Sequence, residues 1–72
     1  MKLNYYRDTD SLYIDLCENP SAESREVSAG IVLDFDVAGA LVGIDIDNAS
    51  SKVDLSRVVL SGMPGGTERS AD

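Results

Sequence analysis

Hydrophobic and polar residues alternate with a period of two in four short segments of the chain. This period is typical of β-strands, because successive side chains of a strand point to opposite faces of its sheet. The alternating hydrophobic positions are Leu3 and Tyr5; Leu12, Ile14 and Leu16; Ile31, Leu33 and Phe35; and Val42, Ile44 and Ile46. The pattern therefore predicts four antiparallel strands, each with one apolar and one polar face.

A four-residue loop, 7–10, joins the first two of these segments. A loop of this length places Tyr5 opposite Leu12 and Leu3 opposite Ile14. Both pairs then lie on one face, and a slip of one residue would turn either set outward. The sequence predicts a first hairpin in this register.

A second loop of the same length, 36–39, joins the last two segments. It places Leu33 opposite Val42 and Ile31 opposite Ile44, again on one face. Its final glycine can supply the positive φ that such loops often need. The sequence therefore predicts a second hairpin.

Residues 17–25 are polar and contain a proline, which predicts a loop between the two hairpins. If Leu16 pairs with Val27, then Leu12 faces Ile31. The strands would then form a continuous antiparallel meander in chain order.

The pattern changes after Ile46. Leu55, Val58 and Val59 have the spacing of one helical stripe, and several possible N-cap residues precede them. Because two adjacent β-branched residues also suit a strand, residues 54–60 could instead form a fifth strand. We favour the helix. The predicted fold is α+β and mainly β: a four-stranded meander and one short C-terminal helix in a domain of residues 1–62, followed by a flexible tail of residues 63–72.

The predicted core is small for the sheet that it must hold together. A chain of 72 residues sits near the lower limit of independent stability, and its single cysteine, Cys17, cannot close an internal disulfide. One or two turns of helix would hardly cover a four-stranded face. We therefore expect a homodimer, or a protein partner that packs on the sheet.

Charge and residue usage narrow the classes of function. Thirteen acidic and six basic residues give a net charge of −7, which disfavours nucleic acid and anionic membranes as partners. The chain contains no histidine, which removes the commonest general base and a common metal ligand. The start of the chain does not read as a signal peptide, and the lone cysteine suits a reducing compartment, so we expect a cytoplasmic protein.

Three motifs resemble those of the domain of unknown function 2283, a family of small bacterial and archaeal proteins. They lie at residues 5–14 (Tyr-Tyr-Arg-Asp-Thr-Asp-Ser-Leu-Tyr-Ile), 30–36 (Gly-Ile-Val-Leu-Asp-Phe-Asp) and 39–50 (from Gly39 to Ser50). The family usually has Asp where this chain has Tyr6, and often Glu where it has Asp45. The resemblance implies a β-rich fold and no particular activity.

Asp34, Asp36 and Asp45 have a spacing that partly fits a calcium-binding loop. The flanking segments read as strands rather than helices, and Ala38 occupies a position that normally supplies an oxygen. We therefore interpret the three as exposed strand and turn residues. We assign no catalytic, cofactor-binding or metal-binding residue and expect no enzyme.

The function predicted from the sequence is a non-enzymatic homodimerising or protein-interaction module. One alternative is a weak divalent-cation or small-ligand module that uses the Asp34, Asp36 and Asp45 carboxylates. Another is an antitoxin-like partner of a second protein, which would rest on small size and acidity alone.

Overall fold

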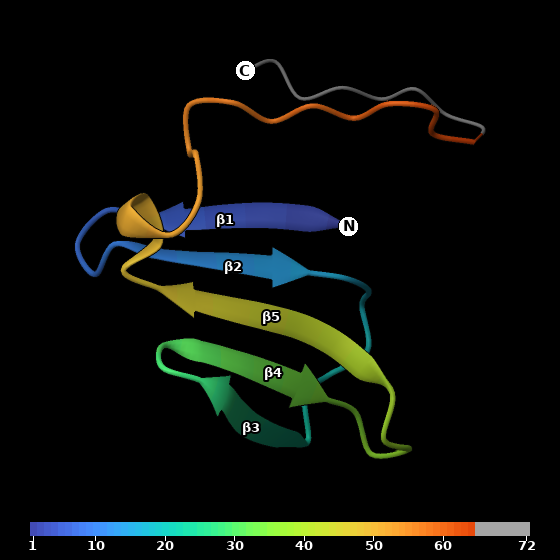
Figure 1. Cartoon of the computed structure of the whole chain (residues 1–72). Coiled ribbons are helices and arrows are strands. Elements are labelled where there is room, and N and C mark those ends of the chain that lie inside the picture. Colours follow the sequence, from blue (N-terminus) through green and yellow to red (C-terminus); the bar gives the residue numbers. More distant parts are fainter. Residues whose placement is uncertain (65–72) are drawn as a thin grey trace.

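Five antiparallel strands form one sheet in the computed structural model, which describes residues 1–64 (Figure 1). The spatial order is β1-β2-β5-β4-β3, so the last strand in the chain lies in the middle of the sheet. The elements are β1 (Lys2–Tyr6), β2 (Ser11–Asp15), β3 (Glu23–Ser28), β4 (Ile31–Phe35), β5 (Leu41–Asp47) and a single 3-10 turn, η1 (Ala49–Ser51).

The first hairpin has the predicted register. Tyr5 pairs with Leu12 and Leu3 pairs with Ile14, and the connection occupies residues 7–10. Asp10 closes the turn with a φ of 53°. Aspartate tolerates this left-handed conformation better than most residues, because its short side chain can bond nearby backbone groups.

The predicted meander in chain order is wrong. Leu12 lies opposite Ile46 of β5 rather than opposite Ile31, and Ile46 in turn lies opposite Ile31. The β5 strand carries isoleucines on the same face as its two neighbours, so inserting it between β2 and β4 lets apolar side chains pack on both of its sides. Pairing β2 directly with β4 would have left β5 with one such neighbour.

The fold contains a fifth strand where a loop was expected. Within the polar stretch 17–25 the chain becomes extended at Glu23, and β3 pairs with β4 in a register that places Arg25 opposite Leu33. An edge strand bonds to only one neighbour and is largely solvated, so it needs no hydrophobic alternation. A bulge between Glu26 and Ser28 also interrupts any periodic pattern.

The second hairpin keeps its predicted face but not its predicted register. Leu33 pairs with Ile44 and Ile31 with Ile46, a shift of two positions from the expected partners. A register irregularity after Asp34 and a loop of residues 36–40 account for the shift. Because a shift of two preserves the side-chain alternation, the apolar residues stay together. The loop glycine, Gly39, has the expected positive φ, 88°.

The predicted C-terminal helix is also wrong. Residues 54–60 form a turn and an irregular extended segment, neither helix nor strand, and η1 is the sole helical turn among residues 1–64. Two adjacent β-branched residues, Val58 and Val59, disfavour a helix, and both remain exposed, so packing on the sheet does not offset this low propensity. The fold is therefore all-β. Of the predicted tail, residues 65–72 lie outside the described residues.

Four strands contribute to two rows of apolar side chains across one face of the sheet. The paired positions give the rows Leu3, Ile14, Ile44 and Leu33, and Tyr5, Leu12, Ile46 and Ile31. We call these eight residues the apolar face. Within the described chain only Val42, Gly43 and Ala49 are buried, with Val42 at 3% and Ala49 at 0% exposure. The sheet thus has a well-defined apolar face but almost no enclosed core.

Candidate functional site

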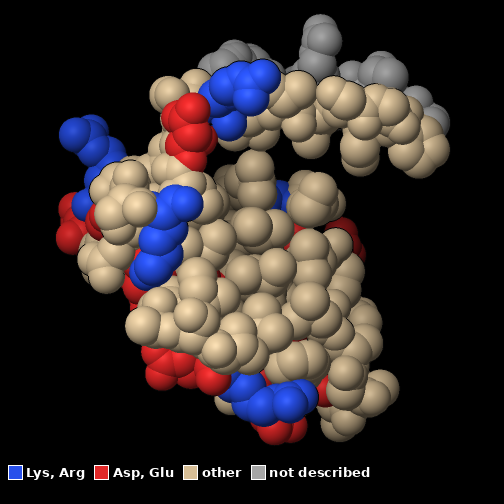
Figure 2. Space-filling view, viewed as in Figure 1, with Lys and Arg blue, Asp and Glu red and all other residues tan. Residues whose placement is uncertain are grey.

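The apolar face is broad, and none of its eight residues is charged. In Figure 2, uncharged residues fill the centre of the molecule and the charged residues lie around its margin. The members of the apolar face on β2, β4 and β5 are half-buried, whereas its two members on β1, Leu3 and Tyr5, are exposed. Apolar patches of this kind on a protein surface typically mark a contact surface.

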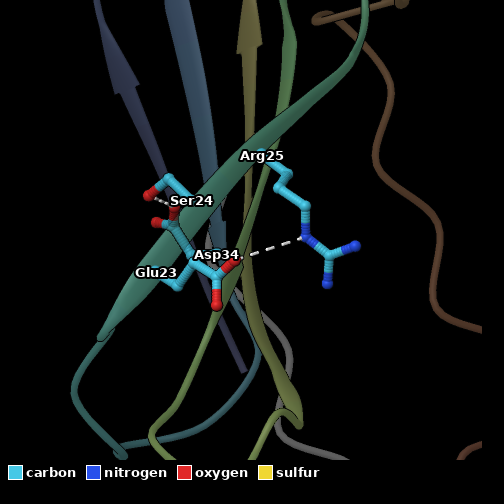
Figure 3. A network of polar contacts seen from close by, with 4 residues as sticks. All are labelled: Glu23, Ser24, Arg25 and Asp34. Carbon is cyan, nitrogen blue, oxygen red and sulfur yellow. Dashed lines mark hydrogen bonds and ion pairs between the residues drawn. The ribbon is translucent and has the colours of Figure 1, made fainter.

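One cation borders this face. Arg25 on β3 continues the row that ends at Leu33 and lies over the Phe35 ring, with its guanidinium carbon 4.2 Å from the ring centroid. The arginine also forms an exposed ion pair with Glu23, at 3.8 Å. Figure 3 shows Arg25 on the opposite side of β3 from Ser24 and Asp34. Arg25 therefore extends the apolar face with its stem and ring contact rather than opposing it.

The opposite face of the sheet is acidic. Alternation along the strands places five carboxylates there: Asp15, Asp34, Asp45, Asp47 and Glu26. Partial burial of Asp45 raises the pKa of that carboxyl above its usual value, and the neighbouring charges of Asp47 and Asp34 raise it further. The two faces thus differ sharply in charge, one nearly neutral and one strongly negative.

A hydrogen-bonded group on the acidic face links three strands. The Tyr13 hydroxyl on β2 donates to Asp34 on β4 at 2.6 Å, and the Ser24 hydroxyl on β3 donates to the other Asp34 oxygen at 2.6 Å. The tyrosine crosses β5 at Gly43, where an added Cβ would lie 2.0 Å from the phenolic oxygen. The bond to Asp34 raises the pKa of Tyr13 to about 12, and desolvation contributes to the rise.

The carboxylates that suggested a cation site have different roles. Asp34 accepts the Tyr13 and Ser24 hydroxyls, and Asp45 shares its face. Asp36 instead organises the β4–β5 loop: one oxygen accepts the backbone N–H groups of Ala38 and Ala40. These bonds lower its pKa. Among residues 1–64, no three His, Cys, Asp or Glu side chains are arranged to hold a metal ion.

A second polar cluster ties the start of the chain to η1. Asp10 accepts hydrogen bonds from the Tyr5 hydroxyl at 2.7 Å, the Ser50 hydroxyl at 2.7 Å and the Ser50 backbone N–H at 3.1 Å. These bonds lower the pKa of Asp10 and raise that of Tyr5. The sequence placed Asp10 in the loop 7–10 but did not predict its link to Ser50. The only available signal was that both residues fall within the family motifs.

The remaining features offer no arrangement of reactive groups. Cys17 is a free, exposed thiol just after β2. Two shallow hollows flank the loops, one lined by residues 19–22, Asp36 and Val37 and the other by residues 5–9. In the described part of the chain, no helix is both long and apolar enough to cross a membrane.

A family model described as a protein of unknown function (DUF2283) matches residues 2–50. The match spans all five strands and ends within η1. It therefore contains both polar clusters, because Tyr13, Asp34 and Gly43, and Tyr5, Asp10 and Ser50, all lie inside it. No curated protein and no solved structure matches the chain.

Proposed function

Because the chain belongs to the DUF2283 family, whose name assigns no activity, we propose from its geometry that it is a non-enzymatic self-association module: two copies stack their apolar faces to form a homodimer. The observation that carries this proposal is the apolar face itself. Eight aligned apolar side chains lie on one side of a single-layer sheet, and no second layer of helix or strand in the described chain packs on them.

Charge favours a second copy as the partner. None of the eight residues of the apolar face is charged, and Glu23 at its β3 margin is ion-paired with Arg25, whereas Asp15, Asp34, Asp45, Asp47 and Glu26 lie on the other face. Stacking two apolar faces would keep the two acidic faces on opposite outer surfaces, in water and far apart. Stacked sheets pack about 10 Å apart with interdigitating side chains, which matches a face built from Leu, Ile and Tyr.

The residue types at the polar clusters support a structural rather than catalytic role. Tyr13 and Ser24 donate to Asp34, and Tyr5 and Ser50 donate to Asp10, so the two carboxylates are occupied by hydroxyls that join distant segments. The clusters hold the sheet and η1 in place, and the apolar face remains as the surface available for function. The free thiol of Cys17 fits the reducing cytoplasm as the setting.

Analytical ultracentrifugation over a range of concentrations tests the proposal. We expect the unmodified chain to sediment as a dimer at micromolar concentration and Leu33→Lys, which places a charge within the apolar face, to sediment as a monomer. The matched control is Val32→Lys, on the same strand but on the acidic face opposite Asp45. A monomeric unmodified chain, or equal effects of the two lysines, would contradict the proposal.

A further inference from the structure

The segment that follows η1 presents apolar side chains that its own chain does not cover. Asp54 closes a turn by accepting the Ser56 N–H and hydroxyl, and beyond it the chain extends. Val58 and Val59 are 63% and 58% exposed, and Leu60 and Met63 are also exposed. We call residues 57–64 the C-terminal arm. No backbone hydrogen bond ties residues 58–64 to the rest of the described chain.

The arm runs beside the open edge of β1. In Figure 1 it leaves the sheet near the β1–β2 loop and turns back in the direction opposite to β1. Figure 2 shows open space between part of the arm and the sheet. The β1 strand carries Leu3 and Tyr5, the most exposed members of the apolar face. An apolar segment without a partner therefore lies at the margin where the apolar face is least covered.

From this we infer that the interface of the proposed dimer includes the arm: Val58, Val59 and Leu60 of one copy pack on the β1 margin of the other copy's apolar face. This inference rests on the proposed function, because it needs the second sheet. Neighbouring side chains of an extended segment point in opposite directions, so Val58 and Val59 are exposed on opposite sides of the arm. Contact with another chain on both sides would bury both valines. Apolar area at the stacked faces and at the two arms then contributes to one continuous interface.

Charge supports a second copy as the occupant. The arm and the residues that lead to it carry Arg57 and Lys52 but only one carboxylate, Asp54, which is already bonded to Ser56. This segment therefore carries a net positive charge, whereas the chain as a whole carries −7, so the segment is attracted to a second copy. The interface elements, namely the apolar face with Arg25 and the arm with Arg57, are the parts in which this negative charge is least concentrated.

The test compares substitution of the two arm valines with substitution of one loop valine, by sedimentation. Val58→Ser with Val59→Ser removes apolar area from the arm without adding charge. We expect it to weaken the dimer about tenfold or more, equivalent to about 1.4 kcal/mol of association free energy. The control is Val37→Ser, which alters a valine in the β4–β5 loop that is 93% exposed and lies outside the proposed interface. This control should leave dimerisation unchanged.

Isotope-filtered nuclear Overhauser measurements on a mixture of labelled and unlabelled copies locate the arm directly. We expect contacts between the Val58 and Val59 methyl groups of one copy and Leu3 of the other. An unchanged dimer with no such contacts would overturn the inference and leave the proposed function standing. Contacts confined to one copy would show that the arm covers its own sheet. A chain that remains monomeric at all concentrations would overturn both.

Discussion

Tyr13 and Asp34 lie on strands that do not pair, yet the Tyr13 hydroxyl donates a 2.6 Å hydrogen bond to Asp34 across the intervening strand β5. The crossing is possible because position 43 has no side chain: the nearest tyrosine atoms occupy the space that a Cβ would fill. The absence of a side chain on one strand thus allows its two neighbours to be joined directly.

This crossing predicts that Gly43→Ala is destabilising. The added methyl group would meet the phenolic oxygen at 2.0 Å and the ring carbon next to it at 2.6 Å, so Tyr13 must move and lose its bond to Asp34. We expect a loss of about 1–3 kcal/mol in the free energy of unfolding, as is typical of overpacking. Urea denaturation measures the change.

A double-mutant cycle supplies the control for this prediction. In a Tyr13→Ala background, which removes the ring, Gly43→Ala should cost far less than it does in the unmodified chain. If the cost of the alanine is the same in both backgrounds, the substitution acts through the backbone of β5 and not through the tyrosine.

The same hydrogen bond predicts an unusual alkaline titration. Because the folded chain raises the pKa of Tyr13 from 10.0 to about 12, the stabilisation by this bond is fully present below pH 10 and is lost as the pH rises through about 12. The ultraviolet absorbance of phenolate reports the titration. The step near pH 12 should disappear in Tyr13→Phe. A spectrum in which Tyr13 ionises near pH 10 in the folded chain would contradict the assignment.

Neutralising Asp45 should stabilise the sheet. Its carboxyl is partly desolvated and faces the charges of Asp47 and Asp34, so its pKa is raised and the folded chain holds its proton more tightly than the unfolded chain. Stability therefore falls as the pH rises from about 3.8 through the raised pKa. We expect Asp45→Asn to increase the free energy of unfolding at pH 7 by about 0.5 kcal/mol, the size of a like-charge pair on a sheet.

Glu18→Gln is the matched control for Asp45→Asn. It removes one negative charge from an exposed loop position and so changes the net charge equally. An equal gain from both substitutions would attribute the effect to net charge alone, and a loss from Asp45→Asn would show that the carboxylate makes a favourable contact. Thermal unfolding at neutral and acidic pH distinguishes these outcomes.

The Asp10 cluster predicts a measurable coupling between the two ends of the matched region. Hydrogen bonds from Tyr5 and Ser50 lower the pKa of Asp10, so the stabilisation that they give is present above its ordinary value of 3.8 and is lost as the pH falls through the lowered pKa. Ser50→Ala should shift the Asp10 pKa back toward 3.8 and speed hydrogen exchange at the amides of residues 49–51. Carbon-detected carboxyl titration measures the shift.

Thr9→Ala is the control for Ser50→Ala, because it changes a hydroxyl beside Asp10 whose side chain is not among the bonds that lower that pKa. An unchanged Asp10 pKa in Ser50→Ala would show that the serine does not bond to the carboxylate in solution.

The register of the first hairpin was predictable from the sequence, whereas the register of the second hairpin and the order of the strands were not. The four-residue loop 7–10 and the alternation around it determine the register of Leu3 with Ile14. The choice of partner for β2 depends on which strand can present apolar residues to two neighbours at once, and pairwise matching of Leu12 with Ile31 did not test that.

The sequence carried too little signal to predict two elements, the β3 strand and the structure of the C-terminal segment. The β3 strand is polar because it lies at an edge, and its bulge breaks the period. The C-terminal segment has an i, i+3, i+4 spacing at Leu55, Val58 and Val59, but two adjacent β-branched valines disfavour a helix, and the segment does not pack its valines on the sheet. Likewise the apolar face followed from alternation alone, whereas the bonds from Tyr13 to Asp34 and from Ser50 to Asp10 depend on contacts between distant segments.

The central position of β5 also determines when the sheet can form during synthesis. Until the ribosome has released residues 41–47, the pair β1–β2 and the pair β3–β4 are not joined to each other. Each is then a two-stranded ribbon, which is marginally stable in water. Folding of the nascent chain should therefore wait for the last strand and then proceed in one cooperative step. A chain that stops before residue 41 would present two unjoined hairpins to the cell's proteases.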